Sequence, residues 1–209
     1  NKMSLYQFRF LIILLVIAPI SFGFLGDDKS GTKQNKPIYK LSSTTDEGGK
    51  KGDAYRLNIN NINLPLNRKG VIAAVNIPND DPNIDGAGGK FGNHVFLFSG
   101  GFFLSGYANG TLFTNAVASA SLVEDYTPGL AGTSGDPRAQ LYVIKSADPA
   151  FGTAWQDWKD AVDLGADFYD GNGDGVYNPV DNNGNGEWDP DEDKPDIIGD
   201  ETVWTVYWD

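Results

Sequence analysis

The order of apolar and polar residues predicts a mainly β body that begins near Tyr55. Leu57 and Ile59 alternate with polar residues, which is typical of a strand with one solvated face. Residues 71–77 are apolar except for Asn76, and this composition suits a strand buried on both faces. The same reasoning predicts further strands at residues 111–117, 120–123, 140–145 and 203–208. We therefore expect a mainly β fold of sandwich-like antiparallel sheets.

Two apolar segments around a pair of glycines predict a buried hairpin. Residues 95–98 and 102–104 flank Ser99, Gly100 and Gly101. Glycine allows the backbone conformations of a tight hairpin turn without steric cost. We therefore expect the two segments to pair with each other across this turn.

Residues 154–164 form the one segment that stands out as a helix. Thr153 and Gln156 have the spacing of a capping box, in which each side chain bonds a backbone N–H at the start of a helix. Gly165 follows the last turn, where a glycine commonly ends a helix. The sequence therefore predicts a single short helix between the last β strands.

The apolar face of this predicted helix carries two tryptophans. Trp155, Trp158 and Val162 recur at helical spacing. Exposed tryptophans can serve as a platform on which sugars stack, but a stripe at helical spacing more often packs into a core. We expect both indoles to pack against the sheet.

Residues 170–192 contain one eleven-residue phrase written twice, DGNGDGVYNPVDNNGNGEWDPDE. Gly175 and Gly186 stand at position 6 of the two copies, where a calcium loop turns most sharply. Calcium binds six to eight oxygen atoms, which alternate residues of such a loop supply. The candidate ligands are Asp170, Asn172, Asp174, Val176 (backbone carbonyl), Asn178 and Asp181 in the first copy, and Asp181, Asn183, Asn185, Glu187 (backbone carbonyl), Asp189 and Glu192 in the second.

Negative charge is concentrated in the same part of the chain. Residues 170–201 hold eleven carboxylates against Lys194 alone, a net charge of −10 out of −12 for the whole chain. So dense a cluster is either bound to cations or an extended, solvated acidic linker. The fixed register of glycines and oxygen ligands favours calcium. The overall negative charge disfavours nucleic acid as a partner.

The two copies resemble calcium loops of two known kinds. The first, D-x-N-x-D-G-x-x-N-x-x-D, resembles a dockerin loop, which like an EF-hand would be followed by a helix. Here the tandem continues instead with Asn182, Asn183 and Gly184, which are poor helix formers, so the pair is more similar to thrombospondin type 3 repeats. Asn183 and Asn185 are neutral where that pattern usually has aspartate, which predicts a weaker second site. Asp181, shared by both copies, is expected to couple the two ions.

The N-terminal residues predict export. Arg9 precedes an apolar run at residues 10–20, and Ser21 and Gly23 supply small residues before a cleavage point, so residues 1–23 are predicted to be a signal peptide. The apolar run is too short and too interrupted for a permanent membrane anchor. The chain has no cysteine, so calcium would replace disulfides as the cross-link of an exported protein.

The rest of the chain divides by composition. Residues 24–54 are polar and of mixed charge, which predicts a disordered tether. The β-rich domain then covers residues 55–169 and the tandem loops residues 170–196. Residues 197–209 are expected to form a strand that continues into a downstream region missing here.

The search for catalytic residues yields no complete site. His94 is the single histidine, so neither a zinc tetrad nor more than one triad can be built, and a structural role is expected for it. The segment 85–92, DGAGGKFG, lacks the first glycine and the final Ser or Thr of a phosphate loop. Glu124 and Asp125 would point to opposite faces of a strand and cannot form a glycosidase pair. We expect no enzymatic activity in this segment.

From residue 55 onward the chain also resembles the N-terminal region of large secreted surface proteins of Bacteroidetes-like bacteria that use type IX secretion. The resemblance lies in the phrases FLFSGGFFLSG, VASASLVEDYTPG, DPRAQLYVIKSADP, WQDWKDAVDLGADFYDGNGDGVYNPVD and GDETVWTVY. It implies an extracellular or cell-surface location and names no reaction.

These expectations combine into one functional hypothesis with two alternatives. The chain is expected to be a secreted or cell-surface structural or adhesion module that calcium rigidifies, with a surface polysaccharide or another surface protein as partner. One alternative is an accessory, carbohydrate-binding domain of a secreted hydrolase. The other is a dockerin-like module that docks to a protein. Exposed aromatics in a groove would favour sugar binding, and a flat sheet face or an open edge would favour assembly.

Overall fold

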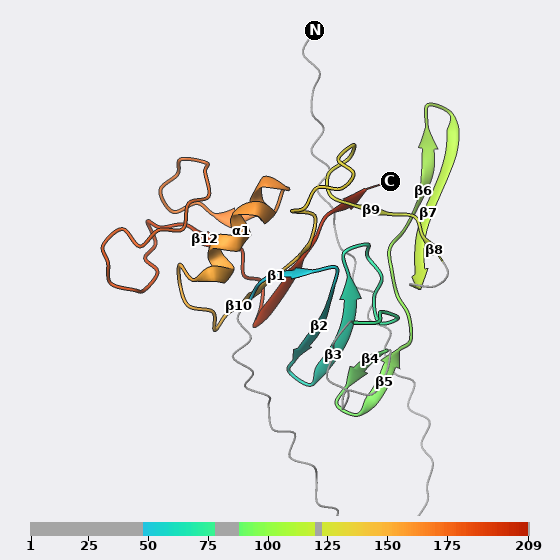
Figure 1. Cartoon of the computed structure of the whole chain (residues 1–209), viewed down its shortest axis with the longest axis horizontal. Coiled ribbons are helices and arrows are strands. Elements are labelled where there is room, and N and C mark those ends of the chain that lie inside the picture. The colour runs from blue at the N-terminus through green and yellow to red at the C-terminus, as the bar shows by residue number, and fades with distance from the viewer. Residues whose placement is uncertain (1–47, 78–87, 120–122, 209) are drawn as a thin grey trace, which may run out of the picture. The chain divides into compact units, whose positions relative to one another are not determined.

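A computed structural model describes residues 48–77, 88–119 and 123–208 (Figure 1). The predicted signal peptide and most of the predicted tether lie outside these residues, as do residues 85–87 of the phosphate-loop segment and most of the strand expected at 120–123. No helix in the described ranges is long and apolar enough to cross a membrane.

Short antiparallel sheets are the predominant regular structure of the described chain, alongside a single short helix, which confirms the mainly β fold. One sheet has the order β1 (Gly49–Gly52), β10 (Leu141–Lys145), β13 (Glu201–Trp204). A second has the order β2 (Ala54–Ile59), β3 (Ile62–Asn67), β4 (Gly89–Phe91), β5 (His94–Leu97), and a third β6 (Phe103–Ala108), β7 (Thr111–Ser119), β8 (Val123–Glu124). Two further pairs join β9 (Thr127–Pro128) to β14 (Tyr207–Trp208) and β11 (Phe168–Tyr169) to β12 (Lys194–Pro195).

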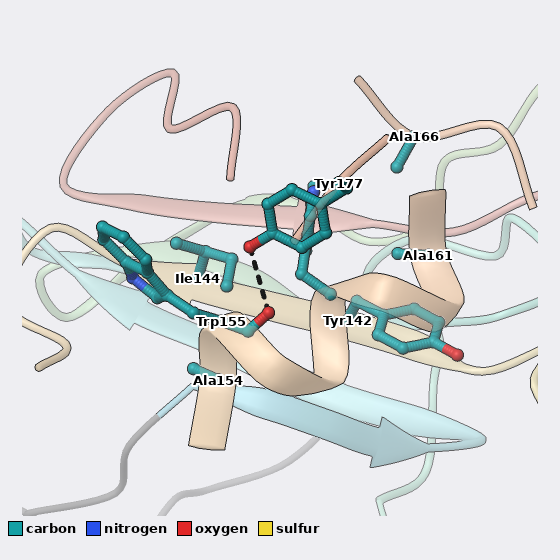
Figure 2. Close-up of a cluster of buried hydrophobic side chains, with 8 residues drawn as sticks. Tyr142, Ile144, Ala154, Trp155, Ala161, Ala166 and Tyr177 are labelled. Atoms are coloured by element: carbon teal, nitrogen blue, oxygen red, sulfur yellow. Dashed lines mark hydrogen bonds between the residues drawn. The ribbon is translucent and has the colours of Figure 1, made fainter. Parts of the chain in front are cut away.

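The main core lies between β10 and the helix α1 (Thr153–Asp163). Trp155 and Trp158 are 5% and 2% exposed, so the prediction that the tryptophan face packs against the sheet is confirmed. Trp158 meets Tyr142 of β10 edge to face, with ring centroids 6.5 Å apart. In Figure 2, Tyr177 reaches this cluster from beyond the helix. Burial of large aromatic rings dominates the energy of such a core.

The two ends of α1 differ from each other in how well the sequence predicted them. The capping box is wrong, because Gly152 is the N-cap residue and no side chain caps the helix. Gln156 instead donates its side-chain amide to the carbonyl oxygens of Phe151 (3.2 Å) and Pro179 (3.0 Å). Gly165 has φ +106° and its N–H bonds the carbonyl of Val162, so the predicted glycine stop is confirmed.

The predicted tether was wrong over its last residues, because β1 pairs with β10 along residues 49–52. A Cβ atom on Gly48 would overlap the backbone oxygen of Val143, so the close approach needs glycine. Lys50 adds an ion pair to Asp160 at 2.7 Å. A strand of glycines and lysines has no apolar alternation, so its pattern resembles that of a tether.

The predicted strand at 71–77 does not form. Ile72 makes only isolated bridges, and Ala73 has φ +72°, which interrupts an extended conformation. Val71, Ala73 and Val75 are buried, while Ile72 and Ala74 between them are only partly buried, so one face is fully buried and not two.

The hairpin predicted from 95–98 and 102–104 is also wrong. β5 pairs back to β4, and β6 pairs forward to β7 across Asn109 and Gly110, whose φ angles are +50° and +81°. A type I′ turn, the usual two-residue hairpin loop with this geometry, requires positive φ at both central residues, and Asn-Gly is a preferred pair. The Asn-Gly turn therefore determines the pairing, and Phe98 and Phe103 are 82% and 62% exposed instead of buried.

The other expected strands are close to the observed ones. Strands at 111–117 and 140–145 correspond to β7 and β10. The strand expected at 203–208 is divided into β13 and β14, which pair with different partners.

Two buried tyrosines and one partly buried tyrosine predict that stability falls in alkaline solution. Burial raises the pKa of Tyr142, Tyr177 and Tyr207 above the ordinary value. The folded chain therefore keeps protons that the unfolded chain releases near pH 10, and the stabilisation is complete below about pH 10 and lost as the pH rises above it. The free energy of unfolding measured with urea should be smaller at about pH 11 than at about pH 9. In Tyr177→Phe, the decrease between these two pH values should be smaller than in the unaltered chain. Equal free energies at both pH values would contradict this expectation.

Candidate metal centre

The first acidic loop (residues 170–181) is organised around the carboxylate of Asp170. Asp170 Oδ1 accepts hydrogen bonds from the backbone N–H groups of Gly173 (2.7 Å) and Asp174 (3.2 Å). Asp170 Oδ2 accepts from the N–H of Gly175 at 2.9 Å. Gly175 has φ +77°, so the turn that brings its N–H to Asp170 favours glycine.

The second acidic loop (residues 181–192) repeats this arrangement around Asp181. Asp181 Oδ1 accepts from the N–H groups of Gly184 (2.6 Å) and Asn185 (3.2 Å), and Oδ2 accepts from Gly186 (2.8 Å). These donors, the N–H of Gly186 above all, hold the pKa of Asp181 below its ordinary value. The repeat in the sequence is therefore also a repeat in three dimensions.

Side chains at positions 3 and 5 of both loops accept the backbone N–H two residues ahead. The bonds run from Asp174 to Asn172 (2.8 Å), from Val176 to Asp174 (2.7 Å), from Asn185 to Asn183 (2.9 Å) and from Glu187 to Asn185 (2.7 Å). Such Asx turns place oxygens of alternate residues around a tightly turned backbone. Calcium loops use the same spacing of ligands.

The two loops differ at position 9. In the second loop, Asp189 Oδ2 accepts from the amides of Asn183 (2.7 Å) and Asn185 (3.0 Å), so three predicted ligands lie together. In the first loop, Asn178 Oδ1 lies 3.4 Å from the ammonium of Lys159 on α1. The predicted ligand Asn178 therefore contacts α1 through its side chain.

The second loop is closed by its predicted last ligand. Glu192 Oε1 accepts from the N–H of Asn182 at position 2 (2.6 Å), and Oε2 accepts from the N–H of Asp189 at position 9 (3.0 Å). One carboxylate therefore joins the beginning and the end of the loop.

Asp181, the expected shared ligand, makes no described hydrogen bond that closes the first loop. Asp193 provides the equivalent contacts, because Oδ1 accepts from Gly171 (3.0 Å) and Oδ2 from Asn178 (2.8 Å), again positions 2 and 9. The hydrogen bonds described for Asp181 all lie within the second loop. Asp193 was missed because the repeat ends at Glu192, and no sequence spacing links a residue after the second loop to the first.

The two closing carboxylates are buried. Glu192 is 2% exposed and Asp193 1% exposed, and among the described residues no lysine, arginine or histidine forms an ion pair with either. A buried charge without a counter-charge is costly. A cation would remove this cost.

The oxygen atoms of the loops fit calcium better than they fit zinc. Carboxylate, amide and backbone oxygens are the ligands that calcium prefers, whereas zinc prefers nitrogen and sulfur. Within the described ranges, no three Asp, Glu, His or Cys side chains are grouped as a metal site. A calcium site can use amide and backbone oxygens as well as carboxylates.

Tyr177 of the first loop belongs to the core cluster, and Trp188 of the second loop packs against it. Tyr177 donates its hydroxyl to the carbonyl of Trp155 at 3.0 Å (Figure 2). Trp188 donates its indole N–H to the carbonyl of Glu192 at 2.9 Å, and the ammonium of Lys194 lies 3.7 Å from the Trp188 ring centroid. Figure 1 shows both loops beside α1 and β12. The position of the loops is thus linked to the packing of the helix.

The other candidate residues belong to other segments of the described chain. His94 is exposed at the start of β5, and Asp125 Oδ2 accepts the backbone N–H of Ala116 at 2.9 Å. A cavity of about 290 Å³ is lined by Asp53, Asn67, Arg68 and Lys69, with no aromatic side chain. None of these residues belongs to the acidic loops.

Comparison of the chain with protein-family models, with curated proteins and with solved structures gives no match.

Proposed function

We propose that the chain is a secreted or cell-surface structural or adhesion module whose loops at residues 170–193 are rigidified by two calcium ions. The observation that carries the proposal is the matched hydrogen bonding of Asp170 and Asp181, each of which accepts three N–H groups at the same positions of its loop. Independent loops rarely share ligand positions and backbone geometry by chance.

Bound calcium would neutralise and cross-link the acidic segment. The oxygens of Asp170, Asn172 and Asp174 would hold one ion, and those of Asp181, Asn185 and Asp189 the other, together with further oxygens of each loop. This chain's own residues then transmit the restraint to the core, through Tyr177 to α1 and through the β11–β12 pair. Rigidity of a chain without disulfides is the benefit we assign to the ions.

Export and surface location are part of this proposal. Residues 1–23 have the composition of a signal peptide, and calcium is abundant enough outside cells to fill sites of micromolar to millimolar affinity.

Docking to a surface protein is favoured over sugar binding. Trp155 and Trp158 are buried in the core and cannot stack on a sugar. The exposed aromatic residues lie on short sheets and their connections, where no described cavity is lined by them, and include Phe91, Phe96, Phe98, Phe102, Phe103 and Tyr107. Apolar surface of this kind is typical of a contact with another protein. The carbohydrate-binding alternative would require a groove with aromatic walls.

Isothermal titration calorimetry with calcium tests the proposed function. We expect binding of two ions with affinities between micromolar and millimolar, and no comparable binding of magnesium, which demands a stricter octahedral site. Asp174→Ala should abolish binding at the first loop only, and the exposed Asp191→Asn should leave both sites unchanged. Absence of binding heat at millimolar calcium, or equal preference for magnesium, would refute calcium as the ligand.

A further inference from the structure

We propose that Asp193, and not Asp181, supplies the closing carboxylate of the first calcium site. This inference rests on the proposed function and assigns to each ion its own closing residue, Asp193 for the first loop and Glu192 for the second. Asp181 then serves the second loop alone, as its first ligand.

The equivalence of the two closing residues comes from their partners. In a calcium loop of this length, the carboxylate at position 12 is the ligand that closes the site. Glu192 holds that position in the second loop and bonds the N–H groups of positions 2 and 9. Asp193 bonds positions 2 and 9 of the first loop, at 3.0 and 2.8 Å. The same two donors in each loop therefore identify the same role.

Burial points independently to a cation at both residues. Asp193 is 1% exposed and has no ion pair within the described part of the chain. Hydrogen bonds from neutral N–H groups offset only part of the cost of burying a carboxylate. Two such carboxylates on adjacent residues also repel each other, and one divalent ion beside each would offset both costs.

The backbone of the first loop lies close to the backbone of Glu192 at Gly171. A Cβ atom on Gly171 would overlap the backbone N, C and O atoms of Glu192, so the chain at position 2 lies directly against the 192–193 pair. Glycine at this position lets the N–H of Gly171 reach Asp193. The second loop has Asn182 there, and its N–H reaches Glu192 instead.

The first site is therefore built from residues on both sides of the second loop. Residues 170–178 supply most of its ligands, and Asp193 reaches it only after the chain has passed through residues 181–192. Ordering of the 192–193 pair by one ion would place the closing carboxylate of the other. The two ions are thus coupled through adjacent closing residues, not through a shared Asp181.

Calcium titration followed by NMR on the ¹⁵N-labelled full chain tests the assignment. The amide of Gly175 bonds Asp170 and reports the first loop, and the amide of Gly186 bonds Asp181 and reports the second. In Asp193→Asn, the calcium concentration that produces half of the Gly175 chemical-shift change should rise at least about tenfold. The corresponding concentration for Gly186 should change much less. The exposed Asp191→Asn is the matched control and should titrate like the unaltered chain.

Asp181→Asn provides a second, independent test that does not depend on the folding of the Asp193 variant. It should weaken the response of Gly186 and leave most of the response of Gly175. An unchanged Gly175 titration in Asp193→Asn, or an equal loss at both glycines in Asp181→Asn, would overturn the assignment while leaving calcium binding itself in place. Absence of any calcium response in the unaltered chain would instead refute the proposed function.

Discussion

Trp158→Ala should lower the free energy of unfolding by about 3–5 kcal/mol, because it leaves a large cavity between α1 and β10. Trp158 is 2% exposed, and its ring meets those of Tyr142 and Trp204 at centroid distances of 6.5 and 6.3 Å. Its indole N–H also donates to the carbonyl of Asp167 at 3.1 Å, just before β11. The variant therefore loses packing, and the carbonyl of Asp167 loses its side-chain donor.

Urea denaturation at a fixed calcium concentration measures this loss. Phe98→Ala is the matched control, because Phe98 is 82% exposed and its truncation should change the free energy of unfolding by no more than about 0.5 kcal/mol. A loss in Trp158→Ala no larger than that of the control would show that the helix face does not hold the core together.

Removal of calcium should destabilise the chain by a comparable amount. An ion that binds only the folded state stabilises it by about 2.7 kcal/mol when its free concentration is a hundredfold above the dissociation constant. Without the ions, Glu192 and Asp193 stay buried without a counter-charge, and the net −10 of residues 170–201 favours expansion.

The melting temperature at increasing calcium concentration measures this effect. It should rise with calcium, fall on addition of a chelator, and respond much less to magnesium. Asp191→Asn should show the same rise as the unaltered chain, since Asp191 is exposed and closes neither loop. A melting temperature that is equal in calcium and in chelator would mean that calcium does not stabilise the folded chain.

Where periodicity or local turn chemistry decides the structure, the sequence was sufficient. The helical recurrence of Trp155 and Trp158 predicted their burial, because a wide apolar face must be covered. Gly165 predicted the end of α1, since a positive φ at this position favours glycine. The spacing of Asp170 and Asp181 located both loops, because the contacts of each first carboxylate are made within five residues.

Where the structure depends on residues distant in the chain, sequence patterns were not sufficient. β1 is held by backbone pairing to β10 and by glycines that allow close approach, neither of which leaves an apolar pattern. The predicted hairpin at 95–104 failed because a stronger local signal, Asn109-Gly110, pairs β6 with β7 instead. That signal was present in the sequence and outweighs an apolar run around glycines.

The closing residue of the first loop belongs to the same class of long-range contact. Asp193 lies 22 residues from Gly171 and 15 from Asn178, so its role follows from how the second loop folds back. Sequence repeats identify contacts within a repeat, whereas contacts between repeats need the three-dimensional path of the chain. The hydrogen bonds inside each copy were therefore predictable, and those of Asp193 to the first loop were not.

Hydrogen exchange of the full chain, measured with calcium and with a chelator, tests the central claim most directly. Calcium as a structural cross-link predicts that chelation speeds exchange in peptides covering residues 168–195, whose N–H groups bond the loop carboxylates, and then in β13 and β14, which follow them. Strands β2 and β3, outside the acidic segment, should keep their protection. Equal exchange across residues 168–208 in calcium and in chelator would contradict a structural role for the ions.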